Sequence, residues 1–395
     1  MTKHKVAILI PTMNRSDFLI RQLQYYASVN SPHPVYIGDA SDDEHKEQLE
    51  MTIEQLQHLI TIHYHHWPGH NDRQALARLI ELTEESYCAF AGDDDFLIPN
   101  SLTKCARLLK QNQEYRTAQG KGPVFTLDEP GPYGEMKGLG AYWLKNEIEE
   151  NTGKQRLLKF FPQSYFVNQF SVHRKEEFLQ DSEFYQIIDD SSFAELLHTS
   201  LAVIKGKSKF IDSLYLIRHV HPEQHTGSYL NWKNDFFDWL THPDWQPSFQ
   251  VFNDTLIRAL CEVDGIEENE ASEIVKQAFW SYLAGGMWRK YQSKYGQTTS
   301  SKQNAIVNGK VNSWKSLREL VKKIPGAREV VNQLRNVKAS IVPRHVDKMT
   351  KEDHWAIRAE KGELLLPALL HPSSPYHDDF MPVYEAITKR PVTSK

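Results

Sequence analysis

The first hundred residues alternate short apolar runs with stretches whose apolar side chains recur at helical spacing. A continuous run of β-branched and aliphatic residues is typical of a strand covered on both faces of a parallel sheet. The predicted strands are 6–10, 35–38, 60–64 and 87–91, and the predicted helices are 17–27, 44–59, 72–82 and one that opens at Pro99. This βαβαβαβ order predicts a doubly wound α/β sheet, whose ligands bind beyond the carboxyl ends of its strands.

Beyond residue 110 the pattern is less regular. The segment 120–140 is rich in glycine and proline, which suits a loop or lid over an open site, with a strand at 124–127 inside it. We expect further strands at 163–174 and 210–221, with a helix at 191–199 between them. The predicted domains are an α/β domain at 1–225 (donor half 1–110, acceptor half 111–225), a helical extension at 226–300, and a basic amphipathic helix with a C-terminal tail at 301–395.

Composition restricts the classes of function. The 395 residues, 40% hydrophobic and 25% charged, are typical of an ordinary globular protein with room for two or three domains. A net charge of -5 gives no whole-chain basic field, so we expect no nucleic-acid partner. The three cysteines are isolated and indicate a reducing compartment. Because no stretch resembles a signal peptide or a membrane span, we expect a cytoplasmic protein.

One stretch departs from the near balance of acidic and basic residues in the whole chain. Between residues 302 and 351, twelve Lys and Arg face three acidic residues. Within it, 314–324 places apolar side chains at helical spacing and basic ones elsewhere on the helix. Two interpretations stay open: reversible docking on the anionic inner face of the cell membrane, and a basic face packed on the catalytic domain or on another subunit of a homo-oligomer.

The most informative motif is Asp93-Asp94-Asp95, directly after the apolar run 87–91. Three adjacent carboxylates repel one another, so folding them at a strand end is costly unless a cation or ligand hydrogen bonds offset the repulsion. Asp93 and Asp95 point to the same side in extended backbone, so one can hold a ribose hydroxyl or water while the other binds a divalent metal. The alternative is a solvated acidic turn that caps the following helix.

Two other predicted strands also end on polar residues. Asp39 ends the second strand, where a carboxylate can accept a hydrogen bond from a nucleotide base; a turn-forming Asp is the alternative. Thr12 and Arg15 follow the first strand, where they can contact base or phosphate, while Asn14 equally suits a helix cap. The histidines at 63, 65, 66 and 70 are interpreted as mostly structural, because strand alternation separates His65 from His66.

Four motifs in order carry a resemblance to a known family. They are VAILIPTMNR at 6–15, YIGDAS at 36–41, NDRQALA at 71–77 and AGDDDFLIP at 91–99. The sequence resembles the family 2 glycosyltransferases of the GT-A fold, well over about 4–110 and loosely over 111–221. The resemblance implies a Rossmann-like α/β fold with a mostly parallel central sheet flanked by helices. It also implies transfer of a sugar from a nucleotide-diphosphate donor.

The resemblance implies a role for each residue that matches a motif. Pro11, Thr12 and Arg15 would line the nucleotide pocket, Asp39 would recognise the base, Asp72 and Arg73 would border the pocket, and Asp93 and Asp94 would contact the nucleotide. Asp93 and Asp95 would also hold Mn²⁺ or Mg²⁺ on the diphosphate, which stabilises the charge that develops on the leaving group. The residue at position 39 indicates a UDP-sugar, with CDP and GDP donors left open.

An inverting displacement also needs a general base on the acceptor side. The family supplies it as the second residue of a Glu-Asp pair before a helix, and the matching place here is Asp189-Asp190. We predict Asp190 as the base with Asp189 in support, although Asp190 also suits a helix cap. His219 or His221, after the last predicted strand, could complete the metal site, since imidazole is an acceptable Mn²⁺ ligand; surface histidines are the alternative.

These observations predict a metal-dependent, inverting glycosyltransferase whose acceptor is a glycan or a lipid-linked glycan of a bacterial surface polysaccharide. Two other functions stay open. A scaffold that binds nucleotide or sugar without catalysis would keep the fold and lose the base. A nucleotidyltransferase is disfavoured, because it normally needs a glycine-rich phosphate loop after the first strand and residues 11–15 contain no glycine.

Overall fold

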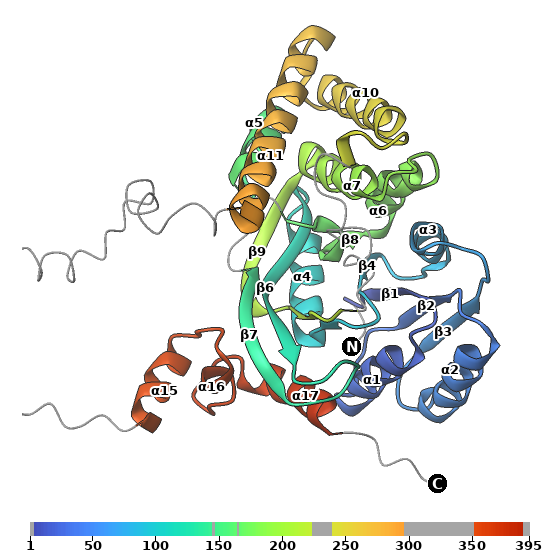
Figure 1. The fold of residues 1–395 in the computed structure, drawn as a ribbon, viewed down its shortest axis with the longest axis vertical. Helices are drawn as coiled ribbons and strands as arrows, with labels where there is room; N and C mark the ends of the chain where they lie inside the picture. The colour runs from blue at the N-terminus through green and yellow to red at the C-terminus, as the bar shows by residue number, and fades with distance from the viewer. Residues whose placement is uncertain (1–3, 144–146, 164–165, 223–238, 296–350, 390–395) are drawn as a thin grey trace, which may run out of the picture. The chain divides into compact units, whose positions relative to one another are not determined.

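The structure is a computed structural model (Figure 1). It describes residues 4–143, 147–163, 166–222, 239–295 and 351–389. The chain forms two compact units, residues 1–282 with 356–395 and residues 283–355, and the first contains the sheet. The predicted basic helix 314–324 lies outside the described residues. In the ranges described, no helix is both long and apolar enough to cross a membrane.

The predicted alternation of strands and helices is confirmed over the first hundred residues. The strands are β1 (Ala7–Thr12), β2 (Val35–Asp39), β3 (Ile62–His66) and β4 (Tyr87–Phe90), and the helices are α1 (Ser16–Ser28), α2 (Asp43–Leu56), α3 (Asp72–Leu82) and α4 (Pro99–Gln111). Figure 1 shows α1 and α2 on one side of β1, β2 and β3, and α3 on the other. The apolar run from Val6 to Ile10 is completely buried between these layers, as expected for a central parallel strand.

The remaining strands extend the sheet. They are β5 (Phe96–Leu97), β6 (Tyr115–Leu127), β7 (Met136–Trp143), β8 (Val172–Arg174), β9 (Lys207–Leu214) and β10 (Leu216–His219). Among the described residues, ten strands form one sheet in the order β3-β2-β1-β4-β8-β6-β10-β5, with β7 and β9 also paired to β6. β1 to β4 pair in parallel, whereas β8 is antiparallel to both β4 and β6. The sheet is therefore mixed, with a parallel half that carries the predicted donor motifs.

Three expectations for the middle of the chain were wrong in detail. The predicted strand 163–174 is a strand only at Val172–Arg174, preceded by the end of α5 (Gly153–Gln163) and a short 3₁₀ helix at Asn168–Phe170. The predicted strand 210–221 is divided into β9 and β10. The predicted lid at 120–140 instead belongs largely to the antiparallel pair β6 and β7.

The glycine content of that segment reflects close packing between strands. A Cβ on Gly120 would lie 2.4 Å from the carbonyl oxygen of Ser213 and 2.9 Å from the Tyr215 side chain. Such distances exclude any larger residue unless the backbone moves. Glycine at this position lets β6 lie against the β9–β10 connection, so a composition typical of a loop here marks a crowded strand.

Further helices follow β8. They are α6 (Lys175–Ser182), a 3₁₀ helix at Glu183–Gln186, α7 (Ser191–Lys205), α10 (Trp245–Asp264) and α11 (Glu268–Tyr295). Phe193 of α7 is completely buried and its ring packs against those of Trp239, Phe252 and Phe279. The aromatic residues after the last strand are therefore a core that joins α7 to the two later helices.

The C-terminal helices α15 (Lys351–Glu360), α16 (Leu366–Leu369) and α17 (His377–Thr388) follow. Residues 356–395 belong to the same compact unit as the sheet. Phe380, Val383 and Ile387 of α17 are completely buried, and α17 lies beside α1 (Figure 1). The carbonyl of Ile387 accepts a hydrogen bond from Gly134 N, in the β6–β7 turn, at 3.2 Å. The C-terminal helix α17 thus packs against α1, the helix that follows β1.

We predict that Phe380→Ala lowers the free energy of unfolding by about 3–5 kcal/mol, because it leaves a cavity between α17 and the rest of the first unit. Glu385→Ala on the exposed side of the same helix should cost less than about 0.5 kcal/mol, since it removes only an exposed pair with Lys389. Urea unfolding followed by circular dichroism measures both. Equal stability of the two variants would show that α17 is not part of this core.

His33 makes a second test of the fold. Its Nδ1 accepts a hydrogen bond from Val6 N at 3.0 Å, and its Nε2 lies 2.9 Å from the Pro99 carbonyl, so the neutral ring with hydrogen on Nε2 satisfies both. Burial lowers the pKa of His33 to about 4. Below about pH 6.5, His33 is therefore protonated in the unfolded chain but stays neutral in the folded chain. The free energy of unfolding consequently decreases as the pH falls from 6.5 to 4.

We expect wild type to lose about 2 kcal/mol more stability than His33→Gln between pH 7 and pH 5, in unfolding measured at both values. Because other groups titrate in both proteins, only the difference between them reports on His33. Parallel loss in the two proteins would mean that His33 is solvated and titrates normally.

Candidate active site

The predicted donor residues meet at the carboxyl edge of the parallel strands. Thr12 ends β1 directly opposite Asp39 at the end of β2, and Pro11 pairs with Gly38. β4 is on the other side of β1 and leads through Gly92 into the acidic triplet, Asp93 to Asp95. Parallel pairing brings these strand ends together, as the topology requires. The triplet is nevertheless not solvated: Asp93, Asp94 and Asp95 are only 4%, 5% and 0% exposed.

Arg15 neutralises two of these carboxylates with a forked contact. Its Nη1 lies 2.8 Å from Asp93 Oδ1, and its Nη2 donates to Asp94 Oδ2 at 2.8 Å. The Thr12 hydroxyl donates to the second oxygen of Asp93 at 2.8 Å. The guanidinium also lies 4.8 Å from the ring centre of Phe18, which favours a cation. The loop between β1 and α1 is therefore tied to the triplet by charge and by hydrogen bonds.

The backbone of the acidic segment is held by α1. Arg21 donates to the carbonyl of Asp94 at 2.6 Å, and Gln22 donates to the carbonyls of Gly92 at 3.0 Å and Asp95 at 2.5 Å. Both side chains are completely buried. Burial lowers the pKa of Arg21 to about 10, so its guanidinium stays charged at neutral pH. The strand end is fixed to the helix independently of the three carboxylates.

Asp95 is bound from the other direction, by β10. Arg218 Nε lies 3.1 Å from its Oδ2, and the backbone N–H of His219 donates to its Oδ1 at 3.2 Å. His221 Nε2 lies 2.9 Å from Asp94 Oδ2 and 3.0 Å from Arg15 Nη2, and its ring stacks on Phe18 with centroids 4.6 Å apart. Residues at and just after the end of β10 thus contact two of the three aspartates, Asp94 and Asp95.

The pKa values of the three carboxyls differ, with those of Asp93 and Asp95 raised and that of Asp94 lowered. Burial raises the pKa of Asp93 and of Asp95 to about 7, with repulsion from Asp94 adding to it and Arg15 or Arg218 opposing it. Burial would raise the pKa of Asp94 as well, but the hydrogen bond from His221 and the charge of Arg15 hold it well below its usual range. Burial lowers the pKa of His219 to about 3, so this ring is neutral.

The residues predicted to hold a metal do not form a ligand set in this arrangement. Both oxygens of Asp93 and both oxygens of Asp95 already accept from the donors named above. In the ranges the structure describes, no group of three or more His, Cys, Asp or Glu residues is placed to hold a metal ion. A divalent ion on the remaining lone pairs of these carboxylates would lie within a few ångströms of the guanidinium group of Arg15 or Arg218. The prediction of Mn²⁺ or Mg²⁺ at Asp93, Asp95, His219 and His221 is therefore not supported by the chemistry of the donor set.

Asp39, the predicted base-recognition residue, is completely buried. Its Oδ1 accepts from Ser41 N at 2.8 Å and its Oδ2 from the Tyr64 hydroxyl at 2.7 Å. Burial, with the hydrogen bond to Asp39, raises the pKa of Tyr64 well above its usual range, so Tyr64 remains a donor. A carboxylate has about four lone-pair sites, and these two donors leave some free for a ligand.

The predicted acceptor-side residues form a separate group. Asp190 Oδ1 caps α7 by accepting from Phe193 N at 2.8 Å, and its Oδ2 accepts from Trp239 Nε1 at 2.9 Å. Asp189 is exposed. Arg73, in the first turn of α3 beside Asp72, donates to the carbonyls of Ile188 and Asp189 at 2.5 and 3.2 Å. Arg73 therefore ties α3 to the approach of α7.

Arg21, Gln22 and Trp239 were missed by the sequence analysis, and Arg218 was not given a role. A signal for the first two existed: both lie on the same helical face as Phe18 and Tyr25, and a polar side chain on an apolar face needs buried partners. The predicted structural role of the histidines in β3 agrees with the structure, since His63 stacks on Tyr36 and His65 on Trp67.

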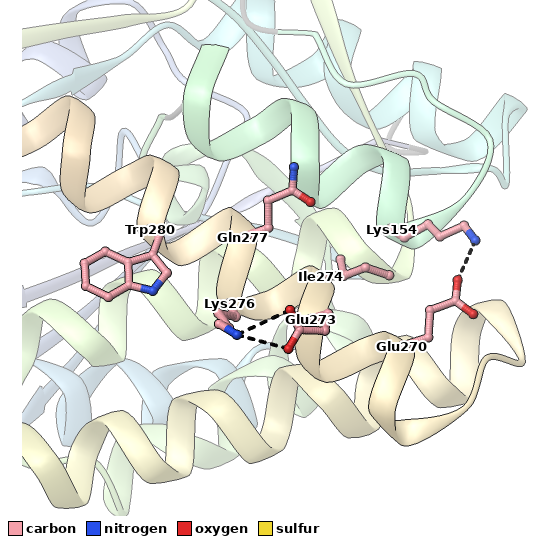
Figure 2. Close-up of a pocket in the computed structure, with 7 residues that line it drawn as sticks. All are labelled: Lys154, Glu270, Glu273, Ile274, Lys276, Gln277 and Trp280. Atoms are coloured by element: carbon pink, nitrogen blue, oxygen red, sulfur yellow. Dashed lines mark hydrogen bonds and ion pairs between the residues drawn. The ribbon is translucent and has the colours of Figure 1, made fainter.

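A surface hollow of about 560 Å³ lies between the start of α5 and α11 (Figure 2). Its lining residues are Lys154, Glu270, Glu273, Ile274, Lys276, Gln277 and Trp280. The charged ones pair with each other, Lys154 with Glu270 at 2.9 Å and Lys276 with Glu273 at 3.0 Å. None of the predicted site residues lines this hollow, so we assign the candidate site to the sheet edge.

Comparison with known proteins gives a fold and no family. No known family model matches the sequence, and no curated protein matches it. The similar solved structures include three of S. aureus TarS, each 13% identical to this chain. The match to TarS covers 74% of this chain and 46% of that chain, with a TM-score of 0.47. The match to TarS 1-349 in complex with UDP-GlcNAc covers 74% and 76% of the two chains with a TM-score of 0.50, and the match to TarS 1-349 in complex with UDP covers 73% and 75% with a TM-score of 0.47. The chain thus spans 46% of the length of the first of these. The similarity to the UDP-GlcNAc complex, together with the mostly parallel sheet flanked by helices, confirms the predicted GT-A type of α/β fold.

Proposed function

We propose that this chain is a glycosyltransferase that moves a sugar from a UDP-sugar to an acceptor glycan or glycolipid of the bacterial cell surface. Its main support is the meeting of Thr12, Asp39 and the acidic triplet at the carboxyl edge of β1, β2 and β4. Ligands of open α/β sheets bind at such an edge. TarS 1-349, which is similar in fold, has been crystallised with UDP-GlcNAc and with UDP.

The side chains at the edge suit the parts of a nucleoside diphosphate. The buried Asp39 carboxylate can accept from the N–H of a uracil base, and Arg15, whose side chain is 18% exposed, can reach an anionic diphosphate. Arginine binds phosphate oxygens through two parallel N–H donors. We include no metal ion in the proposed function, because no group of three or more His, Cys, Asp or Glu residues in the described part of the chain is placed to hold one.

The acceptor side supports an inverting reaction. In such a reaction a carboxylate takes the proton from the acceptor hydroxyl while that oxygen attacks the sugar and the nucleoside diphosphate leaves. We propose Asp190 as this base, with Asp189 as the alternative. The indole of Trp239 and the cap on α7 fix the orientation of Asp190, whereas Asp189 is exposed.

Peripheral binding to the inner face of the cell membrane, through residues 314–324, is proposed from the sequence alone.

Asp39→Asn should weaken UDP binding about tenfold or more, measured by isothermal titration calorimetry, because it replaces a charged acceptor with an amide. Asp42→Asn is the matched control. It is exposed and caps α2, a role that asparagine fills equally well. Unchanged affinity in Asp39→Asn would remove the assignment of Asp39 to the base, and absence of UDP binding in wild type would contradict the proposed function.

Asp190→Asn separates catalysis from helix capping. Asparagine is as good a cap as aspartate, so stability should change by less than about 0.5 kcal/mol, whereas Asp190→Ala should lose about 0.5–2 kcal/mol. As a base, however, asparagine is inert, and turnover with a UDP-sugar should fall by about 10²–10⁴ while UDP binding is kept. Full turnover in Asp190→Asn with loss in Asp189→Asn would reverse the assignment. Full turnover in both would exclude a base at this position.

A further inference from the structure

The candidate site balances its negative charges with arginine. Three carboxylates stand in a row at the end of β4, and three guanidinium groups contact the same segment: Arg15 binds Asp93 and Asp94, Arg218 binds Asp95, and Arg21 binds the Asp94 carbonyl. With all three carboxyls ionised and the histidines neutral, the charges of these six groups sum to zero. The repulsion expected among three adjacent carboxylates is therefore offset by the protein itself.

This balance opposes a divalent ion. A metal that took a remaining lone pair of Asp93 or Asp95 would lie within a few ångströms of a guanidinium that contacts the same carboxylate at 2.8 or 3.1 Å. Like charges so close in a partly buried site repel strongly, because little water is present to screen them. Arg21, which is completely buried, adds a third positive charge beside the same segment.

The same balance favours an anion. The two Nη atoms of Arg15 contact Asp93 and Asp94, but its Nε is buried without a hydrogen-bond partner among the described residues. A buried donor of this kind is costly until a ligand or water satisfies it. It belongs to a side chain that contacts the acidic triplet, beside the predicted diphosphate site.

We propose that Arg15 supplies the positive charge that the donor's diphosphate requires, so that the nucleotide binds without a divalent metal ion. In this arrangement Arg15 both contacts the anion and keeps a metal from the carboxylates of Asp93 and Asp94. The inference rests on the proposed function, because it concerns how that function's donor is held. It differs from the expectation drawn from the sequence, in which the acidic triplet is a metal site.

The decisive experiment measures UDP affinity of the full chain by calorimetry, once in EDTA and once in excess Mn²⁺. We expect the two dissociation constants to agree within about threefold. An affinity at least tenfold higher in Mn²⁺ overturns this inference and leaves the proposed function standing. Absence of binding under both conditions refutes the proposed function and this inference with it. The comparison uses wild type alone, so it does not depend on whether any variant folds.

Arg15→Gln tests the role of the residue itself. It should lower UDP affinity about tenfold or more in EDTA, and it should bind Mn²⁺ alone more tightly than wild type, as followed by the loss of the free Mn²⁺ signal in electron paramagnetic resonance. Arg107→Gln, an exposed change on α4, is the matched control and should behave as wild type. Arg15→Lys keeps the charge and should keep Mn²⁺ excluded. Wild-type Mn²⁺ and UDP affinity in a folded Arg15→Gln would overturn the inference.

Discussion

The ion pairs between Arg15 and the carboxylates of Asp93 and Asp94 are the interaction on which the rest of the site depends. Three consecutive aspartates cannot be buried at a strand end unless positive charges accompany them. This requirement accounts for the arginine and glutamine that α1 presents to the interior, and for the contact between the end of β10 and the acidic segment that follows β4. The contacts that neutralise the carboxylates of the site therefore also hold its helices and strands together.

The elements that meet this requirement come from distant parts of the chain. Arg15 and Arg21 come from the region after β1, and Arg218 from the end of β10. Arg21 also donates to the carbonyl of Pro132 in the β6–β7 turn, and the same turn is bound to α17 by Gly134 N. The acidic segment is therefore held by α1 and the end of β10, and α1 is in turn connected to the β6–β7 turn and, through it, to α17.

How much of this was predictable depends on the range of the interactions. Strands and helices of the first hundred residues follow from local periodicity, and parallel pairing places Thr12, Asp39 and Asp93 together without further information. The pairing of Arg218 with Asp95 joins residues 123 positions apart, and no local pattern records it. The split of the strand at Tyr215, and Gly120 against the carbonyl of Ser213, likewise result from tertiary crowding. Sequence patterns thus predicted the acidic residues and Arg15 at the site, whereas the contacts of Arg21 and Arg218 with the acidic segment are visible only in the fold.

The most direct test is a crystal structure of the chain soaked with UDP and Mn²⁺, with anomalous scattering recorded at the manganese edge. The account predicts a nucleotide at the edge of β1, β2 and β4, its diphosphate within hydrogen-bond distance of the Arg15 guanidinium, and no anomalous peak at Asp93 or Asp95. A manganese peak bridging those carboxylates and the diphosphate, with Arg15 turned away, would contradict it.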